Sequence, residues 1–309
     1  MPYYLGIDGG GTKTTCALGD ESRVLATVTA GPSNMFRVGE QRARESLHDA
    51  VRRACAAAGI APREVACTCL GASGAGRPEI AAVVRNALAE ILPNQIEVIG
   101  DMEIALDAAF DTGPGVIVIA GTGSIAYGRD RQDRTARAGG WGFAIGDEGS
   151  AHWIGRQAVT AVLRESDETC AMEQNFFPSE FASALCRAWE ATSLVDFARK
   201  ASAVPPPDFA VLFPLVAASK HDLALRIQSM AGKELARIAA IVSHRLFPAN
   251  ETDPVPVAMI GGVFRHAPTV REHFYNELRR LDPRVEVNPQ VVEPVDGALR
   301  MARRVASSR

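Results

Sequence analysis

The feature that most constrains this chain is a glycine-rich turn between two apolar runs, and it occurs twice. Residues 5–15 read LGIDGGGTKTT and residues 118–124 read VIAGTGS, with an alternating run after each turn. Such a pattern predicts a β-hairpin, whose glycines let backbone N–H groups converge on an anion. Two hairpins of this kind predict two similar lobes that hold the phosphates of one nucleotide. The pattern favours a phosphotransferase, or at least an ATPase.

Length and composition exclude several classes of protein. The 309 residues suffice for two domains, and with 22% charged residues and a net charge of −3 there is no basic excess of the kind that nucleic-acid binding requires. No apolar run approaches the roughly 18 residues that span a bilayer. No basic segment precedes an apolar core at the N-terminus, so no signal peptide is expected. We expect a cytoplasmic protein that binds neither nucleic acid nor a membrane.

The periodicity of apolar residues predicts an α/β protein with two lobes. The first lobe reads β-β-β-α-β-α-β-α, and the second repeats the three opening strands before it becomes rich in helices. The breaker DTGPG at residues 111–115 marks the expected crossing between them. The expected strands are 3–8, 14–19, 23–29, 65–70, 96–99, 116–120, 124–128, 134–138, 257–260 and 285–287. The expected helices are 40–58, 78–92, 102–110, 148–165, 179–189, 193–202, 208–219, 222–246, 268–281 and 295–306.

The first glycine turn, residues 9–14, is not a Walker loop. It lacks Gly-Lys-Ser/Thr in direct succession, and a strand rather than a helix follows it. Asp8 ends the preceding strand, so its carboxylate is expected to face the phosphates, where it could hold Mg²⁺ through water. The alternative is a tight structural hairpin that Asp8 supports, although three successive glycines exceed what a hairpin needs.

The second glycine turn, residues 121–124, opens a stretch that fits the dinucleotide fingerprint GxGxxA. A Rossmann fold would require a helix directly after it, so that the helix N-terminus meets the pyrophosphate. Residues 127–130 instead continue a strand into a turn. The sequence therefore disfavours a dinucleotide site here.

Asp101 follows Gly100 at the end of an expected strand and opens a helix. Aspartate is a favoured N-cap, which is the alternative interpretation of this position. In open α/β sheets, however, ligands bind beyond the ends of the strands, and a phosphoryl acceptor hydroxyl needs a carboxylate to take its proton. We expect Asp101 to be this general base, with Glu103 as the reserve candidate.

Three further loops could recognise a polar ligand. Residues 139–150, GGWGFAIGDEGS, form the tryptophan loop, in which glycines bring the backbone close to a ligand and an aromatic ring and carboxylates suit a sugar. Asn34 and Ser73 lie in glycine-containing loops after expected strands and could bind hydroxyl or amide groups. Ordinary capping and turn chemistry is the alternative for all three loops.

Taken together, these segments resemble the BadF/BadG/BcrA/BcrD-type ATPase family of the hexokinase–actin superfamily, and within it the N-acetylglucosamine kinases. The resemblance runs nearly end to end and is most specific in the tryptophan loop. It also covers GGV at 261–263 and EPVDGA at 293–298. The resemblance implies two ribonuclease-H-like lobes, each with a mixed five-stranded sheet, and an interlobe cleft. The expected domains are residues 1–112 with 295–309, and residues 113–294.

The resemblance also implies roles for individual residues. Asp101 would be the base that deprotonates the sugar 6-hydroxyl, and Asp8 would hold Mg²⁺ through water. The residues expected to bind ATP are Gly10, Gly11, Thr12, Lys13, Thr14, Gly121, Thr122, Gly123, Gly261 and Gly262. The residues expected to line the sugar site are Asn34, Ser73, Asp101, Thr122, Gly140, Trp141 and Asp147.

The expected reaction is transfer of the γ-phosphoryl group of ATP to an amino sugar, with N-acetylglucosamine as the first candidate substrate. Glucosamine and N-acetylmuramic acid remain alternative substrates, because they differ from it by a single substituent. An ATPase that activates a dehydratase and a sugar sensor without turnover are alternative functions. A homodimer is expected, because homodimers are common among similar proteins.

Overall fold

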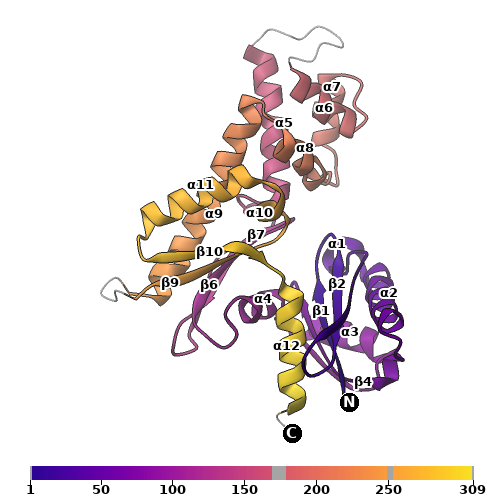
Figure 1. Ribbon diagram of the computed structural model, residues 1–309. Helices are drawn as coiled ribbons and strands as arrows, with labels where there is room; N and C mark the ends of the chain where they lie inside the picture. Colours follow the sequence, from indigo (N-terminus) through magenta and orange to yellow (C-terminus); the bar gives the residue numbers. More distant parts are fainter. Residues whose placement is uncertain (1, 169–178, 249–252, 308–309) are drawn as a thin grey trace. The chain divides into compact units, whose positions relative to one another are not determined.

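The computed structural model describes residues 2–168, 179–248 and 253–307 (Figure 1). Contacts between Cα atoms divide the chain into two units. The first unit comprises Met1–Ile117, Arg129–Asp133 and Val292–Arg309, and the second comprises Val118–Gly128 and Arg134–Val291. The domain boundaries and the interlobe cleft expected from the sequence stay predictions.

The first unit is built on a mixed five-stranded sheet in the order β3-β2-β1-β4-β5. The strand β1 pairs antiparallel with β2 and parallel with β4, and β4 pairs parallel with β5. The strands are β1 (Tyr3–Gly9), β2 (Thr14–Gly19), β3 (Val24–Ala30), β4 (Val65–Ala72) and β5 (Gln95–Gly100). The helices are α1 (Met35–Val38), α2 (Glu40–Ala58), the 3-10 helix η1 (Pro62–Glu64), α3 (Pro78–Ala89), α4 (Asp101–Phe110) and α12 (Pro294–Ser307).

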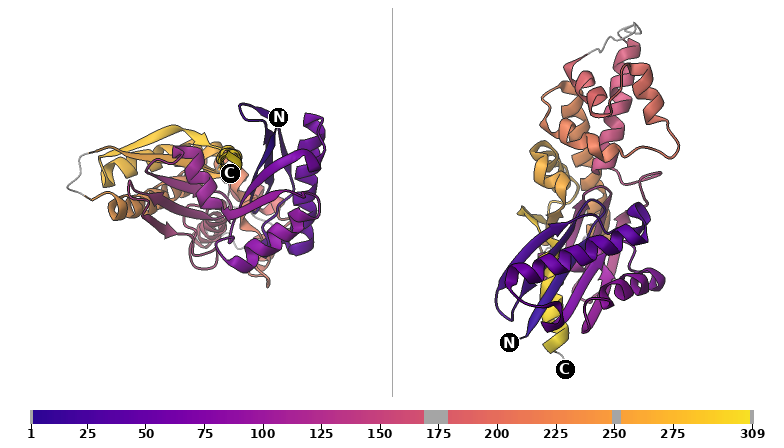
Figure 2. Two further views of the ribbon diagram at one scale, coloured as in Figure 1. Left: turned by 90° about the horizontal axis from the view of Figure 1, so that it is seen from below. Right: turned by 90° about the vertical axis from the view of Figure 1, so that its right-hand side faces the viewer.

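Two apolar cores cover the two faces of this sheet. On one face, Leu5 and Ile7 pack with Leu47 and Val51 of α2, which runs across the strands (Figure 2). The alternation of strand side chains sends Tyr4, Cys67 and Cys69 to the other face, where they pack with Ile104 of α4 and Leu299 of α12. The C-terminal helix is therefore part of the core of the first unit.

The helix α12 packs so closely against the sheet and against α4 that a Cβ atom would not fit at Gly6 or at Gly297. A Cβ atom at Gly6 would collide with the backbone of Leu299, and one at Gly297 would collide with the carbonyl oxygen of Ile104. Arg304 adds an ion pair with the buried Asp107 of α4.

The second unit holds most of the second five-stranded sheet, in the order β10-β9-β6-β7-β8. Its strands are β6 (Gly115–Ala120), β7 (Ser124–Arg129), β8 (Thr135–Gly139), β9 (Val255–Ile260) and β10 (Val285–Val292). Its helices are α5 (Ala151–Glu168), α6 (Glu180–Ala188), α7 (Leu194–Ala201), η2 (Phe209–Leu212), α8 (Phe213–Ala218), α9 (Asp222–Leu246), α10 (Gly262–His266) and α11 (Pro268–Leu281). The two five-stranded sheets confirm the expected α/β fold class.

Several expected elements differ in detail. The helix expected from residue 148 begins at Ala151, because Asp147 and Gly149 have positive φ angles of 59° and 81°. The helix expected at 208–219 is split into η2 and α8, where Pro214 lies in the first turn of the new helix. The strand expected at 285–287 extends to residue 292, since β10 lies at the sheet edge, where Pro289 is tolerated. The short helices α1 and α10 were not expected.

We predict that Gly6→Ala destabilises the first unit by about 1–3 kcal/mol, because the added methyl group must push α12 away from the sheet. Urea denaturation measures the effect. Gly76→Ala is the matched control, since no atom lies within 4 Å of its added Cβ, and it should change stability by less than about 0.5 kcal/mol. Equal stability of the two variants would contradict the close packing of α12.

Candidate functional site

The first glycine turn is a tight hairpin between β1 and β2. Asp8 pairs with Thr15 and Gly9 with Thr14 in the register, and the amide of Gly10 donates to the carbonyl of Lys13 at 3.0 Å. Residues 11–13 form the tip, where Thr12 and Lys13 are exposed. This arrangement leaves backbone groups and a lysine ammonium at the end of the turn, which is the chemistry that a phosphate group needs.

Hydrogen bonds tie this turn to the loop at residues 31–34. The hydroxyl of Thr14 lies 2.7 Å from the carbonyl oxygen of Gly31 and 2.8 Å from Ser33 Oγ. The amides of Ser33 and Asn34 donate to the carbonyl oxygen of Gly10 at 3.1 and 3.3 Å. Thr14 is fully buried, so it supports the turn from within. Its expected contact with ATP stays a prediction.

Asn34 has a structural contact of its own. Its side-chain oxygen accepts a hydrogen bond from the amide of Phe36 at 3.1 Å and caps α1. The capping chemistry that was the alternative for this loop is therefore present. A role of the side-chain amide group toward a sugar stays a prediction.

Asp8, Ser73 and Asp101 lie at one edge of the sheet. Asp8 pairs with Gly71 in the register of β1 and β4, and Ala72 pairs with Gly100 in the register of β4 and β5. Asp8 near the end of β1, and Ser73 and Asp101 directly after β4 and β5, therefore lie at the same end of these parallel strands. Ser73 forms a side-chain hydrogen bond with Asp101. The sheet thus brings together three residues that are far apart in the sequence.

The carboxylate of Asp101 is held by the amide of Met102, which donates to it at 3.0 Å. It is not the N-cap of α4. Gly100 occupies that position, and its amide donates to Glu103 Oε1 at 3.2 Å. The capping interpretation of Asp101 is therefore wrong, and capping is the role of Glu103.

Both aspartates are perturbed in the same direction. Burial raises the pKa of Asp8 to about 7, with a further increase from the charge of Asp101 and an opposing effect from Lys13. Burial also raises the pKa of Asp101, while hydrogen bonds from the Met102 amide and the Ser73 hydroxyl oppose it. A carboxylate with a raised pKa is a stronger base once it is ionised.

The same two carboxylates affect whether the expected Mg²⁺ could bind at this site. A divalent cation beside Asp8 would offset the repulsion from Asp101, so the charge at this edge suits a cation. Within the described ranges, no group of three or more His, Cys, Asp or Glu residues could hold a metal ion. A single carboxylate fits Mg²⁺ that takes its other ligands from water and substrate phosphates.

The second glycine turn is closed by the Gly121 amide, which donates to the carbonyl of Gly123 at 2.9 Å. The amides of Ala151 and His152, at the start of α5, donate to the carbonyls of Gly121 and Thr122 at 2.8 and 3.4 Å. The turn therefore lies at the N-terminus of a helix of 18 residues. Both amides are thus used by the turn itself, so the start of α5 holds the turn in place, and a contact of the turn with ATP stays a prediction.

The Asp147 carboxylate binds backbone amides within the second unit. Asp147 is buried, and its carboxylate accepts hydrogen bonds from the Gly142 amide at 3.2 Å and from the Ser124 amide. A Cβ atom at Gly123 would lie 2.7 Å from Asp147 Oδ2. Asp147 thus links the tryptophan loop to the second glycine turn, and a contact with sugar stays a prediction.

Trp141 is 66% exposed at the start of the tryptophan loop, directly after Gly140. Gly140 has a φ of 66°, and a Cβ atom there would lie 2.6 Å from Ile125. Further along the loop, the ring of Phe143 lies 5.0 Å from the ring of His152, which lies 5.2 Å from that of Phe209. This anchor was not expected from the sequence, because His152 and Phe209 belong to separate helical segments.

Gly261 and Gly262 follow β9 beside the second glycine turn. Gly261 has a φ of 102°, and a Cβ atom there would collide with the carbonyl oxygen of Ala120. A Cβ atom at Gly262 would meet nothing closer than a His266 carbon at 3.9 Å. This open backbone is compatible with the expected approach of adenosine, which stays a prediction.

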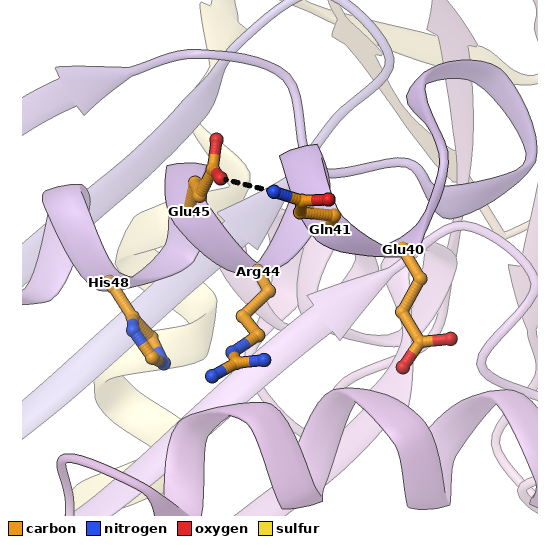
Figure 3. Close-up of a pocket in the computed structure, with 5 residues that line it drawn as sticks. All are labelled: Glu40, Gln41, Arg44, Glu45 and His48. Atoms are coloured by element: carbon orange, nitrogen blue, oxygen red, sulfur yellow. Dashed lines mark hydrogen bonds between the residues drawn. The ribbon is translucent and has the colours of Figure 1, made fainter.

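A hollow lies on the surface of the first unit (Figure 3). The residues that line it all belong to α2 and are Glu40, Gln41, Arg44, Glu45 and His48. Arg44 forms an ion pair with Glu90 at 2.7 Å, and His48 Nε2 lies 2.7 Å from the carbonyl oxygen of Ala87. These contacts join α2 to α3, so the hollow is explained by helix packing.

Comparison with known proteins shows which family the chain belongs to. The chain belongs to the BadF/BadG/BcrA/BcrD ATPase family, which it matches over residues 5–302. It is 31% identical over 308 residues to the N-acetylmuramic acid/N-acetylglucosamine kinase of Clostridium acetobutylicum, covering 98% of this chain and 99% of the relative. It is 32% identical to the N-acetyl-D-glucosamine kinase of Dictyostelium discoideum over 53% of this chain and 55% of the relative.

Among solved structures, a candidate N-acetylglucosamine kinase from Chromobacterium violaceum superimposes with a TM-score of 0.75 at 24% identity. The alignment covers 98% of this chain and 99% of that one. This likeness confirms the fold. None of the helices in the described ranges combines the length and the apolar character needed to cross a bilayer.

We predict that stability depends on pH through Asp8. The folded protein holds the Asp8 proton with a pKa of about 7, against 3.8 for the ordinary group. The stabilisation by this proton is complete below the ordinary pKa and is lost as the pH rises through the folded value. Asp8→Asn should therefore gain stability relative to the unmodified protein as the pH rises from about 4 to about 7.

The measurement is thermal unfolding across this pH range, with a chelator and without nucleotide. Asp133→Asn is the matched control, because Asp133 is exposed in the same unit, and it should follow the unmodified protein. A difference between Asp8→Asn and the unmodified protein that stays constant with pH would contradict the perturbed carboxylate.

Proposed function

We propose that this protein is an ATP-dependent kinase that transfers the γ-phosphoryl group to the 6-hydroxyl of an amino sugar, with N-acetylglucosamine as the first candidate. The observation that carries the proposal is the arrangement of Asp8, Ser73 and Asp101 at one sheet edge next to the first glycine turn. Membership of an ATPase family and the amino sugar kinases among its relatives support it.

In this proposal Asp101 accepts the proton of the attacking hydroxyl. The Met102 amide and the Ser73 hydroxyl fix its orientation, and its raised pKa strengthens it as a base. The hydroxyl oxygen then forms the new bond to phosphorus as the bond to ADP breaks. Lys13 and the backbone of the first glycine turn bind the phosphates, and Asp8 would hold Mg²⁺ through water, where the ion neutralises phosphate charge.

The second unit is proposed to bind the rest of the nucleotide and part of the sugar. The backbone of the second glycine turn would approach phosphate, and the open backbone at Gly262, next to Gly261, would leave room for adenosine. Thr122, Gly140 and Trp141 would contact the sugar, with the indole ring against its apolar face. Closure around the bound sugar would exclude water, so that the sugar rather than solvent accepts the phosphoryl group.

Substitution of the base tests the chemistry. We predict that Asp101→Asn lowers kcat by about 10²–10⁴-fold, because a positioned general base contributes that much, while sugar binding is retained. Coupled measurement of ADP release gives kcat, and equilibrium dialysis gives sugar affinity. Glu103→Gln is the control and should keep most of the turnover. Near-normal turnover of Asp101→Asn would remove it from the base role.

Removal of the indole ring tests the sugar contact. We predict that Trp141→Ala raises the KM for the sugar by about 10-fold, since loss of an aromatic contact costs on the order of 1 kcal/mol or more. Val195→Ala, which shortens a side chain that is 73% exposed on α7, should leave the KM unchanged. An unchanged KM in Trp141→Ala would place the sugar elsewhere.

One assay separates the proposed kinase from other functions. ADP release is measured with N-acetylglucosamine, glucosamine, N-acetylmuramic acid, glucose and no sugar. Release that depends on an amino sugar supports the proposal. Release without sugar would instead indicate an activating ATPase, and binding without release would indicate a sensor. A homodimer is also proposed, and sedimentation analysis tests it.

A further inference from the structure

An arginine lies against the ring that is proposed to bind the sugar. Arg137 belongs to β8, which leads directly into the tryptophan loop, and its guanidinium carbon lies 4.7 Å from the centroid of the Trp141 ring. Both side chains are exposed to solvent. The cation therefore covers part of the indole at the surface, beside the position where the sugar would bind.

The hydrogen-bond donors of this guanidinium remain available to a ligand. A guanidinium contacts an aromatic ring through its charge and its flat face, whereas its five N–H donors point outward in its plane. In the part of the chain that the structure describes, no aspartate or glutamate forms an ion pair with Arg137. Its outward donors thus have no acidic partner among the described residues.

A second cation lies near the same strand. Arg245, near the end of α9, donates from Nη1 to the carbonyl oxygen of Arg137 at 2.8 Å. Its positive charge adds to that of Arg137 at the surface next to the tryptophan loop. The local field therefore favours an anion and opposes a cation.

Amino sugars differ in the charge that they would bring to this place. Glucosamine carries an ammonium group, N-acetylglucosamine is neutral, and N-acetylmuramic acid carries a carboxylate on its lactyl group. The guanidinium fork matches a carboxylate in both charge and shape. We propose that Arg137 determines specificity within the proposed kinase by binding the lactyl carboxylate of N-acetylmuramic acid, so that the protein accepts this acidic amino sugar. This inference rests on the proposed function.

The test compares Arg137→Met with the unmodified protein. Methionine keeps an unbranched apolar stem against the indole and removes the charge. Affinities for N-acetylmuramic acid, N-acetylglucosamine and glucosamine are measured by equilibrium dialysis without nucleotide, so that the result does not depend on turnover. Arg134→Met is the matched control, because it removes one positive charge three residues earlier.

We expect Arg137→Met to weaken binding of N-acetylmuramic acid relative to N-acetylglucosamine by about 5- to 30-fold, the range from an exposed ion pair to a charge-assisted hydrogen bond. The affinity of Arg137→Met for glucosamine should instead increase, because a charge that repels its ammonium group is removed. The preference of the unmodified protein for N-acetylmuramic acid over N-acetylglucosamine should also decline as salt is added. Arg137→Lys should keep part of the preference, and Arg134→Met all of it.

Equal loss of affinity for the three sugars would overturn the proposal, because Arg137 would then only hold the indole in place. Failure of the unmodified protein to bind N-acetylmuramic acid would overturn it as well. The proposed kinase activity is contradicted by a different result. In that case the sugars bind and Arg137→Met shifts their relative affinities, but no ADP is released with any sugar. The two hypotheses are thus distinguished by one set of variants.

Discussion

The arrangement of the candidate site depends on the strand register in the first unit. Because β1, β4 and β5 run parallel and their ends coincide, the residues at these ends gather at one edge. This places Asp8, Ser73 and Asp101 within one small region. Burial of the two carboxylates beside each other raises the pKa of both. The sheet therefore brings together two carboxylates, of which one could hold a cation and the other could accept a proton.

Close backbone packing keeps this register in place. The helix α12 lies against the sheet at Gly6, and α4 lies against it at Gly71, where a Cβ atom would collide with Ile104. The two helices meet at Gly297. The first glycine turn is held in place by the hydrogen bond between the buried hydroxyls of Thr14 and Ser33. These contacts hold an exposed tip on a rigid base, which reduces the ordering that a bound phosphate would require.

The second unit uses a different means to order its loops. The tryptophan loop has many glycines and little core of its own, yet Asp147 binds its backbone and Phe143 packs on His152. The exposed indole and Arg137 then stand on a supported segment. A loop anchored in this way can present side chains to a ligand without the large entropy cost of a free loop. The same anchoring residues connect the loop to the second glycine turn.

The sequence by itself determined the strands, most helices, both glycine turns and the family, because alternation, helical periodicity and glycine clusters are local signals. Only the tertiary structure decided which polar groups face outward. Thr14 and Asp147 have the composition of ligand contacts, yet both are buried against partners 19 and 23 residues away, Ser33 and Ser124. Glu103 rather than Asp101 caps α4, and Arg137 rests on Trp141. Such pairings depend on where the backbone brings side chains together in space, and spacing along the chain does not encode this.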